Sequence, residues 1–166
     1  MAGLWKLPIL YIVENNGYSM GTSIERGCAG SHQLWRRGEP FGIPGYRCLG
    51  DDVLNLYAVF KALTQEVRET GSPIVLEIDT YRFKGHSMSD PGHYRTKESL
   101  ESAKETRDPL MILETRLVHH NAVPFTDLEK IQDQVRSDMR QLAKDSESWS
   151  LPGLHELNED VWIQNS

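Results

Sequence analysis

Two apolar, β-branched runs mark the most regular part of the chain. They cover residues 8–13 and Ile74–Ile78, and nearly every position in each run is apolar. Such runs are typical of strands that are covered on both faces of a parallel sheet. Residues 46–49, which precede Gly50, predict a further short strand. We therefore expect an α/β fold with a parallel sheet.

A helix is predicted between the short strand and the second long run. Either Asp51 or Asp52 can cap its start, and Gly71 followed by Pro73 has the order that ends a helix. Between these ends, apolar residues recur at intervals of three and four, as on the buried face of a helix. They are Val53, Leu56, Tyr57, Phe60, Leu63 and Val67. Strand, helix and strand at this spacing predict a βαβ unit.

Three helices are expected after the second long run. Asp108 and Pro109 have the residue types of an N-cap and a first helical position. Thr126 and Glu129 have the spacing of a capping box, which predicts the start of another helix. Residues 21–45, in contrast, show no sustained period and predict a long irregular connection, which is usually functional at this length.

Composition limits the kinds of partner. The 166 residues suffice for one domain with a core, and the net charge of −6 argues against a nucleic-acid partner, which requires a basic surface. No segment is apolar for long enough to cross a membrane, and no signal peptide precedes Lys6, so no membrane partner is expected. Cys28 and Cys48 lack CxxC spacing and fit free thiols in a reducing compartment. These features predict a cytoplasmic protein.

Two unusual loops, ENNGYSMGTS and TYRFKGHSMSDPG, follow the two apolar runs. In an open parallel sheet, ligands bind at the edge where the strands end, so both loops should meet there. The first offers the amide oxygen of Asn16 and backbone carbonyls freed by Gly17, and oxygen ligands suit Mg²⁺. The second offers Arg82, Lys84 and His86, which can bind phosphate. Together the loops predict a clamp for a magnesium-bound diphosphate.

Taken one at a time, these residues have simpler interpretations. Asn15-Asn16-Gly17 alone is typical of a turn. A single His86 is more often structural than catalytic, and Met20 alone is typical of core filler. The combination of loops, rather than any one residue, supports the diphosphate site.

The combination also resembles a known family. The segments LWKLPILYIVENNGYSMGTSIER, FGIPGYRCLGDDV and PIVLEIDTYRFKGHSMSDPGHYRT are similar to the alpha subunit of the thiamine-diphosphate-dependent pyruvate dehydrogenase (decarboxylase) component, and LHELNEDVW is similar to that family's carboxyl end. The segment GHSMSDP-x-x-YRT favours the pyruvate branch over the branched-chain 2-oxo acid branch. The resemblance implies part of a thiamine-diphosphate-binding fold, with flanking helices around the sheet. Residues 1–107 would be the carboxyl-terminal portion of that domain, and residues 108–166 its helical extension.

The resemblance also implies a role for each matching residue. Asn16 would bind magnesium through its side-chain oxygen and Tyr18 through its backbone carbonyl. Met20 would hold the cofactor in a bent conformation. Arg82 and His86 would contact the diphosphate, and His86 would also act as a catalytic residue near the reacting acyl group.

Three features bear on how far the match extends. The family motif opens with Gly-Asp-Gly, whose aspartate is the charged magnesium ligand, and this sequence has no such triplet before Asn16. We therefore expect the carboxyl-terminal part of an alpha subunit, with the amino-terminal elements of the fold missing. Lys84 stands where the family has His or Arg, and Ser87 matches a serine that is phosphorylated in mitochondrial relatives, although a purely structural serine is the preferred interpretation.

The implied activity is oxidative decarboxylation of pyruvate with reductive acetylation of a lipoyl group. The implied partners are a beta subunit in an α₂β₂ assembly and the lipoyl-bearing acyltransferase component, in the bacterial cytoplasm or the mitochondrial matrix. Two alternatives stay open. One is an alpha subunit of an acetoin or branched-chain 2-oxo acid dehydrogenase, and the other is a non-catalytic fragment that only docks on a beta-like partner.

Overall fold

The computed structural model describes residues 1–92, 94–159 and 161. It contains two compact units, Met1–His120 and Asn121–Ser166, which are described separately. Parts of the segments GHSMSDPGHYRT and LHELNEDVW, namely His93, Asp160 and Trp162, lie outside the described residues.

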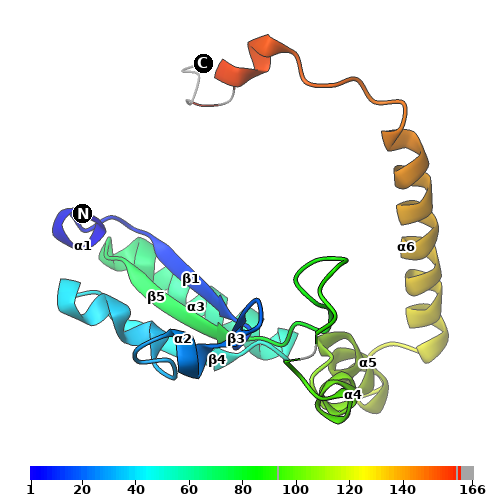
Figure 1. Cartoon of the computed structure of the whole chain (residues 1–166), viewed down its shortest axis with the longest axis horizontal. Coiled ribbons are helices and arrows are strands. Elements are labelled where there is room, and N and C mark those ends of the chain that lie inside the picture. Colours follow the sequence, from blue (N-terminus) through cyan, green and yellow to red (C-terminus); the bar gives the residue numbers. More distant parts are fainter. Residues whose placement is uncertain (93, 160, 162–166) are drawn as a thin grey trace. The chain divides into compact units, whose positions relative to one another are not determined.

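The first unit is built on a three-stranded parallel sheet (Figure 1). Its strands are β1 (Leu10–Asn15), β4 (Gly45–Leu49) and β5 (Ile74–Asp79), arranged in the order β1-β5-β4. The last residues of all three strands lie level with one another in the register. The predicted parallel sheet is confirmed, and the chain leaves β1 and β5 at the same edge.

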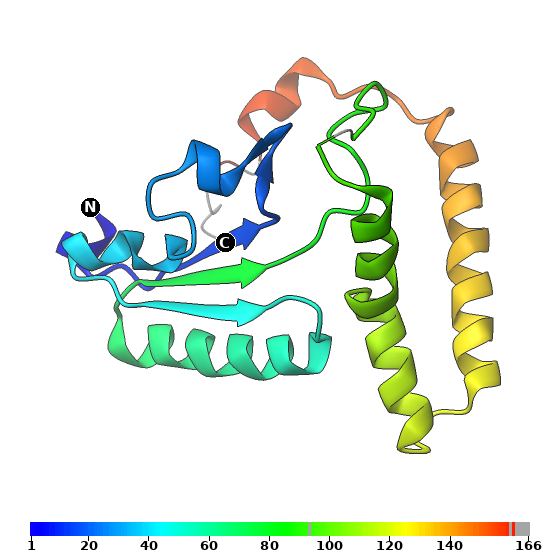
Figure 2. The same cartoon turned by 60° about the horizontal axis from the view of Figure 1, so that its bottom comes forward.

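The central strand β5 is buried on both faces because a helix lies on each side. Leu76 is fully buried and points toward α3 (Val53–Thr70), which runs along the sheet (Figure 2). On the opposite face lies the 3₁₀-helix η1 (Leu34–Phe41), where a Cβ on Gly38 would come 3.1 Å from Val75. The core against α3 consists of Leu63, Val67, Ile74, Leu76 and Ile78.

The predicted burial of residues 8–13 on both faces is wrong. The strand begins at Leu10, two residues later than predicted, and it runs to Asn15. It lies at the edge of the sheet, so Tyr11 is 42% exposed and Ile12 is 47% exposed. An apolar run reports what the chain can bury, whereas actual burial depends on the neighbouring elements.

The predicted helix after β4 is confirmed, with both of its caps. Asp52, rather than Asp51, is the N-cap, and its carboxylate accepts hydrogen bonds from the backbone N–H groups of Leu54 and Asn55. Gly71 ends the helix with a φ of +62°, a left-handed conformation that glycine adopts without strain. The predicted β4–α3–β5 unit is therefore present, with β4 and β5 parallel.

The predicted irregular connection over residues 21–45 is wrong in part. A short hairpin of β2 (Tyr18–Ser19) and β3 (Thr22–Ser23) leads into α2 (Ile24–Gly27), and η1 follows. These elements are too short for a helical period to appear in the sequence, and a 3₁₀-helix repeats every three residues rather than every 3.6.

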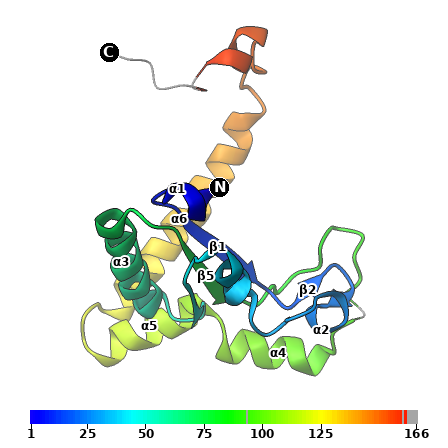
Figure 3. The same ribbon diagram turned by 90° about the vertical axis from the view of Figure 1, so that its left-hand side faces the viewer.

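Two further helices complete the first unit, α4 (Lys97–Thr106) and α5 (Pro109–His119) (Figure 3). Asp108 caps α5 as predicted, accepting from the backbone N–H of Leu110. Arg107, between the two helices, forms a two-pronged ion pair with Asp51, with distances of 2.7 and 3.1 Å. This pair ties the helices back to the start of α3.

The second unit consists of α6 (Phe125–Ser146) and the short 3₁₀-helix η2 (Leu154–Asn158). The predicted capping box at Thr126 is wrong, because α6 begins at Phe125 with Pro124 at the N-cap and no side-chain cap bond. Most of the large apolar residues of α6 are exposed, including Ile131 and Met139. Within the described residues, no helix combines the length and the apolar character needed to span a membrane.

Candidate functional site

The loops that leave β1 and β5 meet around a cavity of about 270 Å³. All five residues predicted for the site line this cavity, together with three that sequence reasoning did not single out. The lining residues are Asn16, Tyr18, Ser19, Met20, Arg82, His86, Tyr94 and Arg95. Among the described residues, the lining does not include Lys84, so the structure places two of the three predicted basic residues at the cavity.

The first loop contains two consecutive side-chain-to-backbone turns. The Oδ1 atom of Asn15 accepts from the N–H of Gly17, and that of Asn16 accepts from the N–H of Tyr18, both at 3.0 Å. Gly17 has a φ of +77°. Turn geometry is therefore present, but an amide oxygen has two lone pairs, so Oδ1 of Asn16 keeps one for a ligand.

The sequence predicted that Gly17 leaves backbone carbonyls of this loop free, but the carbonyl of Gly17 itself is not free. It accepts a hydrogen bond of 2.9 Å from the backbone N–H of Ile24, the first residue of α2. This bond closes the base of the β2–β3 hairpin. The Gly17 carbonyl thus has a structural partner.

Met20 lies at the turn of the hairpin with a backbone that is unusual for a residue with a side chain. Its φ is +51°, in the left-handed region, and its side chain lines the cavity while 61% of the residue is exposed. Non-glycine residues in this region carry strain, which is found disproportionately at binding sites. The sequence contained no sign of this conformation.

The second loop is organised by Asp90, which sequence reasoning missed. Its carboxylate accepts from the backbone N–H groups of His86, at 2.7 Å, and Gly92, at 2.9 Å, and from the hydroxyl of Tyr94 at 3.0 Å. These hydrogen bonds, led by the one from His86, hold the pKa of Asp90 below its usual value. Arg82 donates to the carbonyl of His86 at 3.2 Å. The loop therefore fixes the backbone of His86 from both sides.

Arg95 is a further cation at the cavity. Its guanidinium lies over the rings of Tyr18, Tyr81 and Tyr94, with 5.1 to 5.8 Å to the ring centroids, and it donates to the carbonyl of Arg82. Burial works against the charge of Arg95, but interactions that include a hydrogen bond to Tyr94 outweigh it, so its pKa is raised. The rings of Tyr18 and Tyr94 also contact each other, with centroids 5.1 Å apart, and join the two loops.

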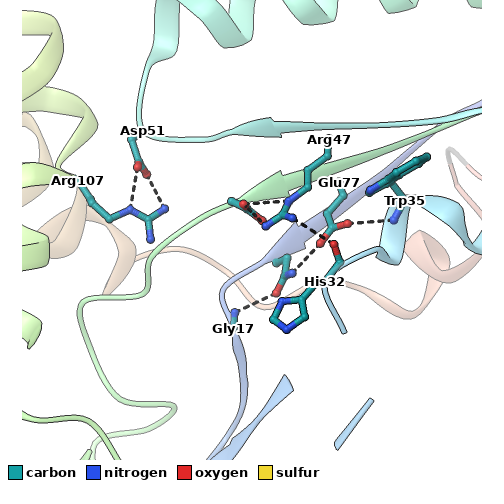
Figure 4. A network of polar contacts seen from close by, with 9 residues as sticks. Gly17, His32, Trp35, Arg47, Asp51, Glu77 and Arg107 are labelled. Carbon is teal, nitrogen blue, oxygen red and sulfur yellow. Dashed lines mark hydrogen bonds and ion pairs between the residues drawn. The ribbon is translucent and has the colours of Figure 1, made fainter. Parts of the chain in front are cut away.

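A polar network that includes the buried residue Glu77 underlies the first loop (Figure 4). The carboxylate of Glu77, fully buried in β5, accepts from Nδ2 of Asn15 at 2.7 Å and from the backbone N–H of Trp35 at 3.0 Å. Beside it, Arg47 donates to the carboxylate of Asp79 at 2.6 Å. Sequence reasoning missed this network, although Glu77 is the one charged residue in the run IVLEI.

The residues that line the cavity suit an anion that binds together with a metal cation. Arg82 and Arg95 supply positive charge and Asn16 a neutral oxygen, and the described part of the lining contains no carboxylate. The described residues also contain no group of three or more His, Cys, Asp or Glu side chains placed to hold a metal. A metal here would be held by neutral oxygens and by the bound anion. The residues present therefore fit a magnesium-bound diphosphate.

Comparison with known proteins places the chain in a family. A model of the family described as "Dehydrogenase E1 component" matches residues 1–154. The chain belongs to this family. It is 43% identical over 98% of its length to the pyruvate dehydrogenase E1 component subunit alpha of Rickettsia felis, and 41% identical over 98% to that of Zymomonas mobilis. It is 40% identical over 99% to the mitochondrial somatic form from Bos taurus.

This Dehydrogenase E1 chain spans about half the length of these relatives, at 49%, 46% and 42% respectively. The resemblance inferred from the sequence motifs is thus confirmed at the level of the family and of its alpha subunits. The family is generally dependent on thiamine diphosphate.

Proposed function

We propose that this chain forms part of the thiamine-diphosphate site in the alpha subunit of a pyruvate dehydrogenase E1 component. The observation that carries this proposal is the meeting of Asn16, Arg82 and His86, from loops after neighbouring parallel strands, around one cavity. The relatives' names support pyruvate as the substrate. The reaction would be oxidative decarboxylation of pyruvate with reductive acetylation of a lipoyl group, the step that precedes acetyl-CoA formation.

Magnesium is assigned to the first loop. Asn16 would bind it through Oδ1 and Tyr18 through its backbone carbonyl, and both residues line the cavity. A neutral oxygen coordinates Mg²⁺ without first losing a proton, and Mg²⁺ typically completes its shell with phosphate oxygens and water. Met20 would support the cofactor in its bent conformation from the same hairpin.

The diphosphate is assigned to the second loop, where Arg82 and His86 supply the donors. When bound, thiamine diphosphate supplies the electron sink that decarboxylation requires. His86 is the proposed catalytic residue, because it is among the residues that line the cavity and because Asp90 accepts a hydrogen bond from its backbone N–H. Its imidazole would hold or deliver a proton at the reacting acyl group.

The proposed partners follow from the same role. They are a beta subunit in an α₂β₂ assembly and a lipoyl-bearing acyltransferase component. The relatives include both bacterial and mitochondrial proteins, so the proposed location is the cytoplasm of a bacterium or the matrix of a mitochondrion.

The test is a calorimetric titration of thiamine diphosphate into the chain mixed with a family beta subunit, with and without magnesium chloride. We expect magnesium-dependent binding. Asn16→Ala should abolish the dependence on magnesium, whereas Asn55→Ala, a matched change at an exposed position on α3, should leave it intact. His86→Ala should lower turnover more than stability, whereas His119→Ala, at an exposed position on α5, should change neither.

Three results would contradict the proposal. Absence of magnesium-dependent binding would remove the cofactor assignment, and unchanged affinity in Asn16→Ala would remove the metal assignment. Turnover of 2-oxoisovalerate or acetoin in preference to pyruvate, in a reconstituted complex, would replace the substrate by that of a sister enzyme.

The exposed side of β1 favours a second candidate function. Tyr11 and Ile12 are 42% and 47% exposed on opposite faces of an edge strand, and exposed apolar residues on an unpaired edge are typical of a strand that docks on a partner. A non-catalytic fragment would bind a beta-like partner through such a face without magnesium-dependent cofactor binding. A chain that is monomeric and monodisperse alone would contradict the exposure argument, and absence of a complex with a beta subunit in sedimentation would contradict this candidate.

A further inference from the structure

Glu77 is an unusual residue for the centre of a parallel sheet. It is fully buried in the middle strand, and burying a carboxylate is costly unless hydrogen bonds compensate. Both of its oxygens have donors. Oε1 accepts from Nδ2 of Asn15, and Oε2 accepts from the backbone N–H of Trp35, which lies 42 residues away in the sequence (Figure 4).

The bond to Asn15 determines which way that amide faces. Both oxygens of Glu77 act as acceptors in these hydrogen bonds, so the nitrogen of the Asn15 amide faces the carboxyl group. The amide oxygen is thereby directed to the other side, where it accepts from the N–H of Gly17 at 3.0 Å. Gly17 is the residue directly after Asn16, and the same turn therefore sets the backbone that carries the Asn16 side chain.

We infer that Glu77 is a positioning residue for Asn16, acting through the amide of Asn15. The inference rests on the proposed function, in which Asn16 binds magnesium. Glu77 lies beneath the first loop and outside the cavity lining formed by the described residues. Its effect on the metal is therefore transmitted through the direction of one amide and the turn that this amide closes.

Glutamine at position 77 keeps the size of the side chain but cannot satisfy both donors. Its single oxygen can accept from Trp35 or from Asn15, and its amide nitrogen then opposes the other donor. The N–H of Trp35 belongs to the backbone and cannot turn away. The Asn15 amide is the group that can rotate, and rotation would bring its nitrogen against the N–H of Gly17.

The first experiment measures magnesium affinity and loop geometry separately. Magnesium chloride is titrated by calorimetry into the full chain with a beta subunit and thiamine diphosphate. Glu77→Gln should weaken magnesium binding by about 10- to 100-fold, the range found for outer partners of metal ligands. In ¹⁵N-labelled chain alone, the Asn15 side-chain NH₂ and the Gly17 amide should lose their protection from hydrogen exchange.

Val67→Ala is the control for general destabilisation. Val67 is 5% exposed and packs in the core near the start of β5, at the opposite end of the sheet from the loops. At a urea concentration that matches its stability to that of Glu77→Gln, Val67→Ala should keep wild-type magnesium affinity. A purely structural role for Glu77 would instead weaken both variants equally.

A rescue variant sharpens the test. In Glu77→Gln combined with Asn15→Asp, the glutamine oxygen can accept from Trp35 while its nitrogen donates to the new carboxylate, whose second oxygen accepts from Gly17. Asn15→Asp alone would place two carboxylates where a 2.7 Å hydrogen bond now stands. We expect each single variant to lose the Gly17 protection and the double variant to regain it.

The outcomes separate this inference from the proposed function. Absence of magnesium-dependent binding in the wild type would overturn both. Wild-type binding that is unchanged in Glu77→Gln would overturn the inference and leave the function standing. Weakened binding without loss of Gly17 protection would also overturn it, because the effect would not pass through the Asn15 amide.

Discussion

Replacing Met20 by alanine and by glycine separates its left-handed backbone from its side chain. The φ of +51° costs a residue that has a Cβ about 1–2 kcal/mol. Alanine retains this cost. Glycine removes it but loses about 0.5–1 kcal/mol through its greater freedom in the unfolded chain. We therefore expect Met20→Gly to be more stable than Met20→Ala by about 0.5–1 kcal/mol.

The effect on cofactor affinity should be the same in both variants. Each removes the thioether side chain that lines the cavity in a residue that is 61% exposed, and a bound cofactor would cover part of that surface. Covering about two methylene equivalents contributes about 1.5 kcal/mol. Both variants should then bind thiamine diphosphate about tenfold more weakly.

Urea unfolding gives the stability difference, and calorimetry with magnesium chloride and a beta subunit gives the affinities. Met88→Ala is the matched control, since Met88 is fully exposed and outside the described lining of the cavity; it should change neither quantity. A glycine variant no more stable than the alanine variant would refute the strain argument. Wild-type affinity in either variant would show that the Met20 side chain does not contact the cofactor.

Three other predictions concern stability. Gly45→Ala should lower the free energy of unfolding in urea by more than about 3 kcal/mol, because the new Cβ would lie 1.9 Å from the backbone oxygen of Trp35. Gly21→Ala is the control. Its Cβ would lie 3.6 Å from the nearest atom, so its stability should stay within about 0.5 kcal/mol of the wild type. A double-mutant cycle on Arg107 and Asp51 should give a coupling of about 1 kcal/mol, and no coupling would mean that their two-pronged pair is screened by solvent. Folding lowers the pKa of Asp90 below its ordinary value of 3.8. The Asp90 carboxylate should therefore contribute to the order of the second loop above pH 3.8, and this contribution should be lost as the pH falls through the lowered pKa. Amide exchange in residues 82–95 should show this acid step in the wild type but not in Asp90→Asn.

The regular elements could be predicted wherever the signal is local. The stripe and caps of α3 and the Asp108 cap of α5 depend on residues a few positions apart, and the structure confirms them. The burial of β1 could not be predicted, because it depends on what pairs with the strand rather than on its composition. The start of α6 was misplaced because Thr126 has the residue type of a cap but lies inside the first turn, after Pro124.

In the candidate site, too, residues with a local signal could be predicted and residues whose partners are distant in the sequence could not. The loops with Asn16 and His86 were found because unusual polar residues follow apolar runs and because their order resembles a family. Glu77 was missed because its donors lie 62 and 42 residues away in the sequence. Arg95 was missed for a related reason, since its role depends on three aromatic rings that come together only in the fold.

The adjacency of β1 and β5 has a thermodynamic consequence. Each strand leads into one wall of the cavity, and β5 also forms the centre of the core, so the loops around the cavity and the core depend on the same pair of strands. A ligand held by both walls would connect the ends of two strands that must separate when the unit unfolds. Its binding free energy would therefore add to the stability of the sheet, by about 2.7 kcal/mol at a free concentration of about 100 times its Kd. Thermal denaturation of the first unit would thus report cofactor concentration.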